Sequence, residues 1–133
     1  MFKQSSKHLA FFSICLCFSL QSFSQADKTV IGTWKGTSIC QVKNSPCHDE
    51  TVVYHISVDK KTGGYAIDAY KIVDGAEDEM GILVGSYDAA KHLLTAHYRA
   101  DDLWEFKIDG DKMDGTLTTP RGLYRIIKLK KEN

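Results

Sequence analysis

Residues 30–36 read Val-Ile-Gly-Thr-Trp-Lys-Gly and place Trp34 between Gly32 and Gly36. Side chains of an extended strand alternate between its two faces, so these three residues share one face. The glycines leave open space on that face, where the indole ring can lie flat beneath another packed group. We therefore expect Trp34 to organise the core at the start of the first strand.

The first 26 residues have the layout of a secretory signal peptide. Lys3 and Lys7 precede an apolar run at residues 9–20, and Ser24 and Ala26 are the small residues of a cleavage site. Cleavage after Gln25 is the alternative. The apolar run is too short to span a membrane, and both cysteines in this segment follow bulky residues, which argues against a lipid anchor. These features predict a secreted or periplasmic protein whose mature domain is residues 27–133.

The mature domain is small and nearly neutral. Removal of residues 1–26 from the 133 leaves 107, enough for one domain. The domain keeps all 17 acidic residues but loses Lys3 and Lys7, so its net charge is about −2. A charge this small argues against nucleic acid or anionic membranes as partners. We expect a monomer with no stable membrane span.

Cys40 and Cys47 are the two cysteines that remain after cleavage. Cysteines in an exported chain usually pair, and the turn-forming run at residues 44–46 lies between these two. We expect one N-terminal disulfide that fixes the end of the first strand. The alternative, a metal site formed by both thiolates and His48, matches no zinc spacing, so no metal is expected.

Downstream of the tryptophan, apolar and polar residues alternate in short runs that predict strands. Eight strands are predicted, at residues 31–40, 51–59, 65–73, 80–87, 92–99, 103–109, 113–119 and 123–130. Asp109-Gly110 supplies the positive φ of a tight hairpin, and the acidic run at residues 74–79 is expected to be a solvated loop. Short links permit antiparallel neighbours only, and closing the sheet removes both edges. The sequence thus predicts an all-β, eight-stranded antiparallel up-and-down barrel.

Alternation also predicts which side chains point into the barrel. The inward sets are Val52, Tyr54, Ile56 and Val58; Leu94, Ala96 and Tyr98; Trp104, Phe106 and Ile108; and Leu123, Arg125, Ile127 and Leu129. Tyr54, Tyr98, Trp104 and Phe106 would then line any cavity inside the barrel. Arg125 is a cation on the most apolar face of its strand.

The chain resembles the calycin group of small barrels, which includes lipocalins, fatty-acid-binding proteins and avidins. The resemblance rests on Gly32-Thr33-Trp34 in the first strand and on Arg125 in the last. These families place a basic residue across the tryptophan, which implies that the Arg125 guanidinium lies within about 6 Å of the Trp34 ring. The lipocalin Thr-Asp-Tyr motif and C-terminal helix are missing from the sequence. Small periplasmic inhibitors of metalloproteases, which are barrels with an N-terminal disulfide, are also similar.

The sequence contains no pattern that indicates catalysis. It has no nucleophile beside a base and no phosphate-binding glycine loop. His55 and His97 fall on polar strand faces, which argues against haem. We therefore expect neither an enzyme nor a cofactor.

Two functions are compatible with these patterns. The first is an exported, non-enzymatic barrel that binds a small hydrophobic molecule inside. The second is an interaction module, or an inhibitor of an exported enzyme. It would act through the loop between Cys40 and Thr51, which presents Pro46, His48, Asp49 and Glu50.

Overall fold

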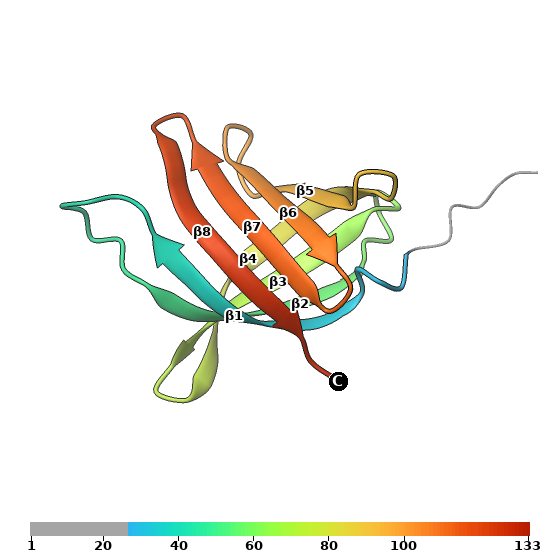
Figure 1. The fold of residues 1–133 in the computed structure, drawn as a ribbon, viewed down its shortest axis with the longest axis horizontal. Helices are drawn as coiled ribbons and strands as arrows, with labels where there is room; N and C mark the ends of the chain where they lie inside the picture. Colours follow the sequence, from blue (N-terminus) through green and yellow to red (C-terminus); the bar gives the residue numbers. More distant parts are fainter. Residues whose placement is uncertain (1–26) are drawn as a thin grey trace, which may run out of the picture.

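The computed structural model describes residues 27–133, which form a closed barrel of eight antiparallel strands (Figure 1). Each strand pairs with the next, and the last pairs with the first, as the sequence predicted. The strands are β1 (Gly32–Cys40), β2 (Glu50–Val58), β3 (Tyr65–Val73), β4 (Ala76–Asp88), β5 (Leu93–His97), β6 (Leu103–Asp109), β7 (Lys112–Thr119) and β8 (Gly122–Lys131). The predicted signal peptide at residues 1–26 lies outside the described residues.

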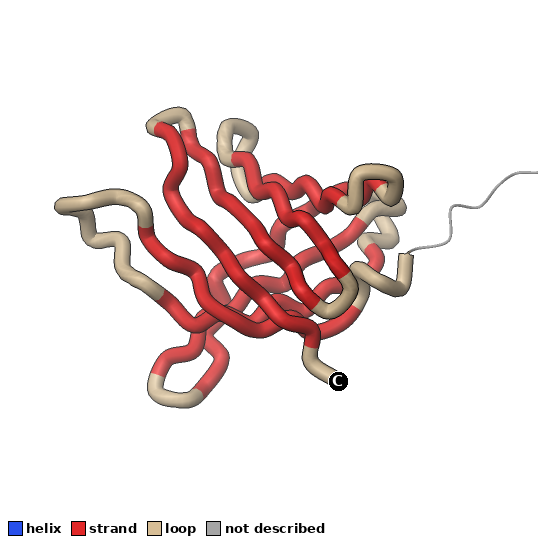
Figure 2. Tube along the Cα trace, in the orientation of Figure 1, coloured by secondary structure: helices blue, strands red, loops and turns tan. Residues whose placement is uncertain are grey.

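Only strands and loops make up the described part of the chain (Figure 2). Accordingly, residues 27–133 include no helix long and apolar enough to cross a membrane. Closure of the sheet leaves neither β1 nor β8 as an unpaired edge strand, because the two hydrogen-bond to each other. The barrel agrees with the fold class that the resemblance to calycins implies.

Trp34 is the anchor of one end of the barrel, which we call the base. Its side chain is fully buried, and its Nε1–H donates to the carbonyl of Val30 at 3.0 Å. The turn at residues 27–30 crosses the base, with Val30 fully buried and the Asp27 amide donating to the Tyr65 hydroxyl at 2.7 Å. The base is therefore closed by the segment that precedes β1.

The basic residue that faces Trp34 is Lys131, so the predicted contact between Arg125 and Trp34 is wrong. Lys131 pairs with Trp34 across β1 and β8, and its Nζ lies 5.4 Å from the indole centroid. Arg125 pairs with Cys40 at the opposite end, which we call the mouth, and its guanidinium lies over Tyr124 instead. The strand face was predicted correctly, but the register between β1 and β8 was not.

The space beside the two glycines of β1 is filled by β8. A Cβ added to Gly32 would lie 2.7 Å from Cε of Lys131. A Cβ added to Gly36 would collide with the carbonyl oxygen of Lys128. The absence of a side chain at Gly32 thus leaves room for Lys131, and its absence at Gly36 lets the backbone of β8 approach closely.

The acidic run at residues 74–79 is mostly strand rather than the loop that was predicted. Residues 76–79 begin β4, and β3 and β4 continue their pairing to Val73 and Ala76. A register shift next to Tyr70 leaves Met80 without a pairing partner in the ladder. The resulting hairpin projects beyond the barrel (Figure 1), so its charges are solvated although its backbone is paired.

The predicted inward faces are correct in the middle of the strands and fail at their ends. Val52, Tyr54, Ile56, Leu94, Ala96, Phe106, Ile108, Ile127 and Leu129 are buried. Val58 and Tyr98 are exposed because they lie at or beyond the last paired residues of their strands. Leu123 is exposed because a register shift beside Thr118 leaves Tyr124 unpaired, which reverses the alternation.

Candidate functional site

The half of the barrel nearest the base is filled by its own side chains. Trp34, Tyr54, Phe106, Ile67, Leu94, Met113 and Ile127 are among its fully buried residues. The rings of Tyr54 and Phe106 meet edge to face with centroids 6.0 Å apart, and burial raises the pKa of the Tyr54 phenol well above its ordinary value. Two of the four residues predicted to line a cavity, Tyr54 and Phe106, are therefore packed in the core.

The other two, Tyr98 and Trp104, border a hollow at the mouth that we call the mouth pocket. Its volume is about 220 Å³, and Ala69, Leu83 and Leu117 contribute to its apolar wall. This volume is below the roughly 300–1,000 Å³ of typical ligand pockets. The barrel interior is thus divided between a solid base and a small open mouth.

The aromatic residues of the mouth pocket differ in their exposure and polar contacts. Tyr98 follows β5 and is 56% exposed, and its ring packs against Gly81, where an added Cβ would lie 2.9 Å from Cε2. Trp104 stacks on Phe106 with centroids 6.2 Å apart. Its Nε1 is buried and has no hydrogen-bond partner among residues 27–133. An unpaired buried N–H is costly, so this N–H reduces the stability of the packed arrangement.

A carboxylate and a guanidinium form the polar part of the pocket. The side chains of Glu50 and Arg125 are only 13% and 12% exposed, and Oε2 of Glu50 lies 3.7 Å from Nη1 of Arg125. The same Nη1 donates to the Ser38 carbonyl and hydroxyl and to the His48 carbonyl, at 3.2–3.3 Å. One nitrogen of Arg125 is therefore bonded to backbone and hydroxyl oxygens, whereas Glu50 has an ion-pair contact without hydrogen-bond geometry.

The position of Glu50 corrects the prediction that it projects from a recognition loop. Glu50 begins β2 opposite Ser38 and shares the inner face with Val52 and Tyr54. That parity was visible in the sequence, because Glu50 lies two residues before Val52. The signal was missed because the strand was predicted to begin at Thr51.

The other predicted loop residues remain outside the pocket. The carboxylate of Asp49 accepts from the backbone amide of Cys40 at 3.0 Å, and His48 reaches the Pro46 carbonyl at 3.2 Å. The disulfide Cys40–Cys47, with a Cα separation of 5.9 Å, is present as predicted. These contacts fix the loop that leads into Glu50.

A broader groove lies on the outside of the mouth. It has a volume of about 600 Å³ between the disulfide loop, the loop that joins β5 to β6 and the turn that joins β7 to β8. Pro46 lines it together with Arg99 and Arg121 and with Asp101 and Asp102. Charges of both signs are present, so the groove has no strong preference for an anionic or a cationic partner.

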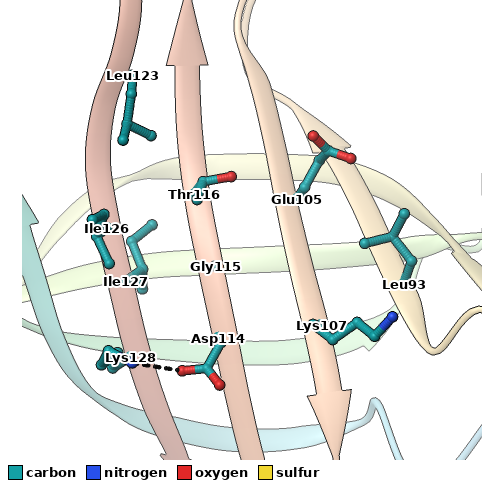
Figure 3. Close-up of a pocket in the computed structure, with 10 residues that line it drawn as sticks. All are labelled: Leu93, Glu105, Lys107, Asp114, Gly115, Thr116, Leu123, Ile126, Ile127 and Lys128. Carbon is teal, nitrogen blue, oxygen red and sulfur yellow. Dashed lines mark hydrogen bonds and ion pairs between the residues drawn. The ribbon is translucent and has the colours of Figure 1, made fainter.

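A shallower hollow of about 370 Å³ lies on the outer face of β6, β7 and β8 (Figure 3). Thr116 and Ile126 lie between charged residues, and Nζ of Lys128 is 3.2 Å from Oδ1 of Asp114. Glu105 lies on this outer face as predicted. The hollow is a surface depression between side chains of the three strands.

A hydrogen-bonded cluster around His55 occupies the opposite outer face. Nδ1 of His55 lies 3.0 Å from the Thr33 hydroxyl, and Nε2 lies 3.0 Å from Oε2 of Glu77. Nearby, Tyr70 donates to Asp68 at 2.9 Å, which raises the pKa of the Tyr70 phenol. The Thr33 hydroxyl, the His55 imidazole and the Glu77 carboxylate thus contact one another in a row, but none of them lines a described pocket. The cluster joins the hairpin of β3 and β4 to β1 and β2, which is a structural role.

Among the residues that the structure describes, no group of three or more His, Cys, Asp or Glu side chains could hold a metal ion.

The chain matches no protein-family model, no curated protein and no solved structure. The class that fold and site define is a closed, eight-stranded antiparallel barrel with one disulfide and a small pocket at its mouth.

Proposed function

We propose that this protein is an exported, non-enzymatic, lipocalin-like barrel that binds one small, largely apolar molecule in the mouth pocket. The observation that carries the proposal is the division of the interior. The base is packed solid, while the mouth keeps about 220 Å³ beside Trp104, Tyr98 and Leu117. The pocket holds one carboxylate paired with one guanidinium and no second acid or base suited to proton transfer.

The pocket volume limits the size of the ligand. An apolar cavity of about 150 Å³ holds a benzene molecule, so about 220 Å³ suits a single ring with a small substituent. A long-chain fatty acid would need more space than the mouth offers. The proposed ligands are therefore limited in size, whereas the sequence alone suggested any small hydrophobic molecule.

The two indole N–H groups provide the test. Trp104 lines the pocket, whereas Trp34 lies at the base with its N–H bonded to the Val30 carbonyl. In ¹⁵N-edited NMR, titration with p-cresol or p-xylene should shift the Trp104 indole signal and leave that of Trp34 in place. Ala69→Leu should fill the pocket and abolish the shift, while Ala66→Leu on the outer face of β3 should not. Failure of both compounds to move the Trp104 signal would exclude this function.

Export is the second part of the proposal. The signal-like segment supports it, and so does the disulfide, since such bonds persist in oxidising compartments. N-terminal sequencing of the protein recovered from the periplasm or medium should give a chain that starts at Ala26 or Asp27. Recovery of the uncleaved chain inside the cell would contradict export.

A second candidate function is protein interaction through the disulfide loop, and the groove of about 600 Å³ favours it. Pro46 lines this groove, and Val42 in the same loop is exposed. Arg121→Glu should weaken capture of an exported partner enzyme without moving the Trp104 signal. Small-molecule binding that survives Arg121→Glu while no partner is captured would leave only the first function.

A further inference from the structure

The geometry of the mouth pocket points to a neutral, single-ring ligand that carries a hydrogen-bond donor, with Glu50 as its acceptor. This inference rests on the proposed function and specifies the chemistry of the molecule that the pocket takes. Its basis is the carboxylate of Glu50, which lines the pocket while its nearest basic nitrogens lie beyond hydrogen-bond distance.

The Glu50 carboxylate lines the pocket without a hydrogen bond to a basic side chain. The basic nitrogens nearest to it are Nη1 of Arg125 at 3.7 Å and Nε2 of His48 at 3.8 Å, both beyond hydrogen-bond distance. The side chain is only 13% exposed, so water compensates little for the missing donors. An O–H or N–H group in the pocket would supply a charge-assisted hydrogen bond, which is stronger than one between neutral groups.

The ion pair selects against charged ligands. An ammonium group would be attracted by Glu50 but repelled by the Arg125 guanidinium 3.7 Å from the same carboxylate. A carboxylate ligand would be attracted by the Arg125 guanidinium but repelled by the Glu50 carboxylate beside it. A neutral donor avoids both repulsions.

Trp104 adds an aromatic wall beside this acceptor, because its indole lines the pocket and stacks on Phe106. A phenolic hydroxyl on a ring bound against Trp104 can donate to the Glu50 carboxylate. Tyr98 and Leu117 supply apolar contacts for the ring.

The test compares four ring compounds of similar size: p-cresol, p-xylene, benzylammonium and benzoate. With the unmodified protein, the Trp104 indole shift should give an affinity for p-cresol at least tenfold higher than for the other three. A pocket that recognised only apolar surface would bind p-xylene more tightly than p-cresol, because a hydroxyl is better hydrated in water than a methyl group. The expected order is therefore opposite to the order that hydrophobicity alone predicts.

Variants of Glu50 identify the acceptor. Glu50→Gln should reduce the preference for p-cresol over p-xylene, and Glu50→Leu should abolish it, whereas Glu132→Leu at the exposed C-terminus should keep it. If Glu50→Leu does not fold, Glu50→Gln and the comparison on the unmodified protein still decide. Equal or tighter binding of p-xylene, or tightest binding of benzylammonium or benzoate, overturns the inference but leaves the proposed function standing. Failure of all four compounds overturns the proposed function itself.

Discussion

Lys131 lies across the base of the barrel with its Nζ 5.4 Å from the ring centroid of Trp34. The same Nζ donates to the carbonyls of Lys28 and Thr29 at 3.1 and 3.3 Å. One side chain of the last strand thus connects the core tryptophan to the turn that closes the base. A cation over an indole and charge-assisted bonds to carbonyls both stabilise this arrangement.

Lys131→Met should therefore destabilise the protein although it keeps most of the apolar stem. The loss of the cation–π contact and of two exposed hydrogen bonds should cost about 1–2 kcal/mol. The control is Lys130→Met, since Nζ of Lys130 lies 3.9 Å from Asp111 on the exposed face and such pairs contribute at most about 1 kcal/mol. Equal urea midpoints for the two variants would refute the role of Lys131.

Two glycines on the inner face should respond differently to a methyl group. A Cβ on Gly36 collides with the backbone of β8, so Gly36→Ala must separate β1 from β8 and should cost about 3 kcal/mol or more. A Cβ on Gly115 collides with the ring of Phe106, which can tilt, so Gly115→Ala should cost about 1–3 kcal/mol. Urea unfolding measures both free energies, and the reverse order would contradict the close approach of β1 and β8.

The disulfide should contribute measurable stability despite its short loop. Cys40 and Cys47 are separated by 7 positions, for which loop entropy gives about 2–2.5 kcal/mol. Dithiothreitol should lower the free energy of unfolding by this amount. A variant with serine at both positions should be equally destabilised and should not respond to the reductant. A reductant effect on that variant would show that the loss has another origin.

Tyr70 should titrate late because its hydroxyl donates to Asp68, which raises the pKa of the phenol above its ordinary value near 10. The folded state holds this proton more tightly, so the contribution to stability is present below about pH 10 and is lost as the pH rises above it. Asp68→Asn should lower the pKa of Tyr70. Ultraviolet titration at the phenolate band checks this, with Tyr70→Phe to identify the transition. An unchanged pKa in Asp68→Asn would exclude this hydrogen bond as the cause.

The prediction of ligand-lining residues separates what local patterns can show from what they cannot. Alternation put Tyr54, Trp104 and Phe106 on inner faces, and all three have that parity in the barrel. It could not show that the edge-to-face packing of Tyr54 and Phe106 fills the base, while Trp104 reaches the mouth. That difference depends on the position of each residue along the barrel axis, and the alternation of side chains does not specify this position.

From the sequence alone, one could obtain the eight strands, their antiparallel order, the inner face of Arg125 and the pairing of Cys40 with Cys47. These features depend on neighbouring residues, through side-chain alternation, turn chemistry and the small number of cysteines. Only the tertiary structure decided that Lys131 meets Trp34 and that Arg125 meets Glu50. The register between β1 and β8 joins residues almost a whole domain apart, and it is set by packing summed around the closed barrel, for which no local pattern of either strand is sufficient.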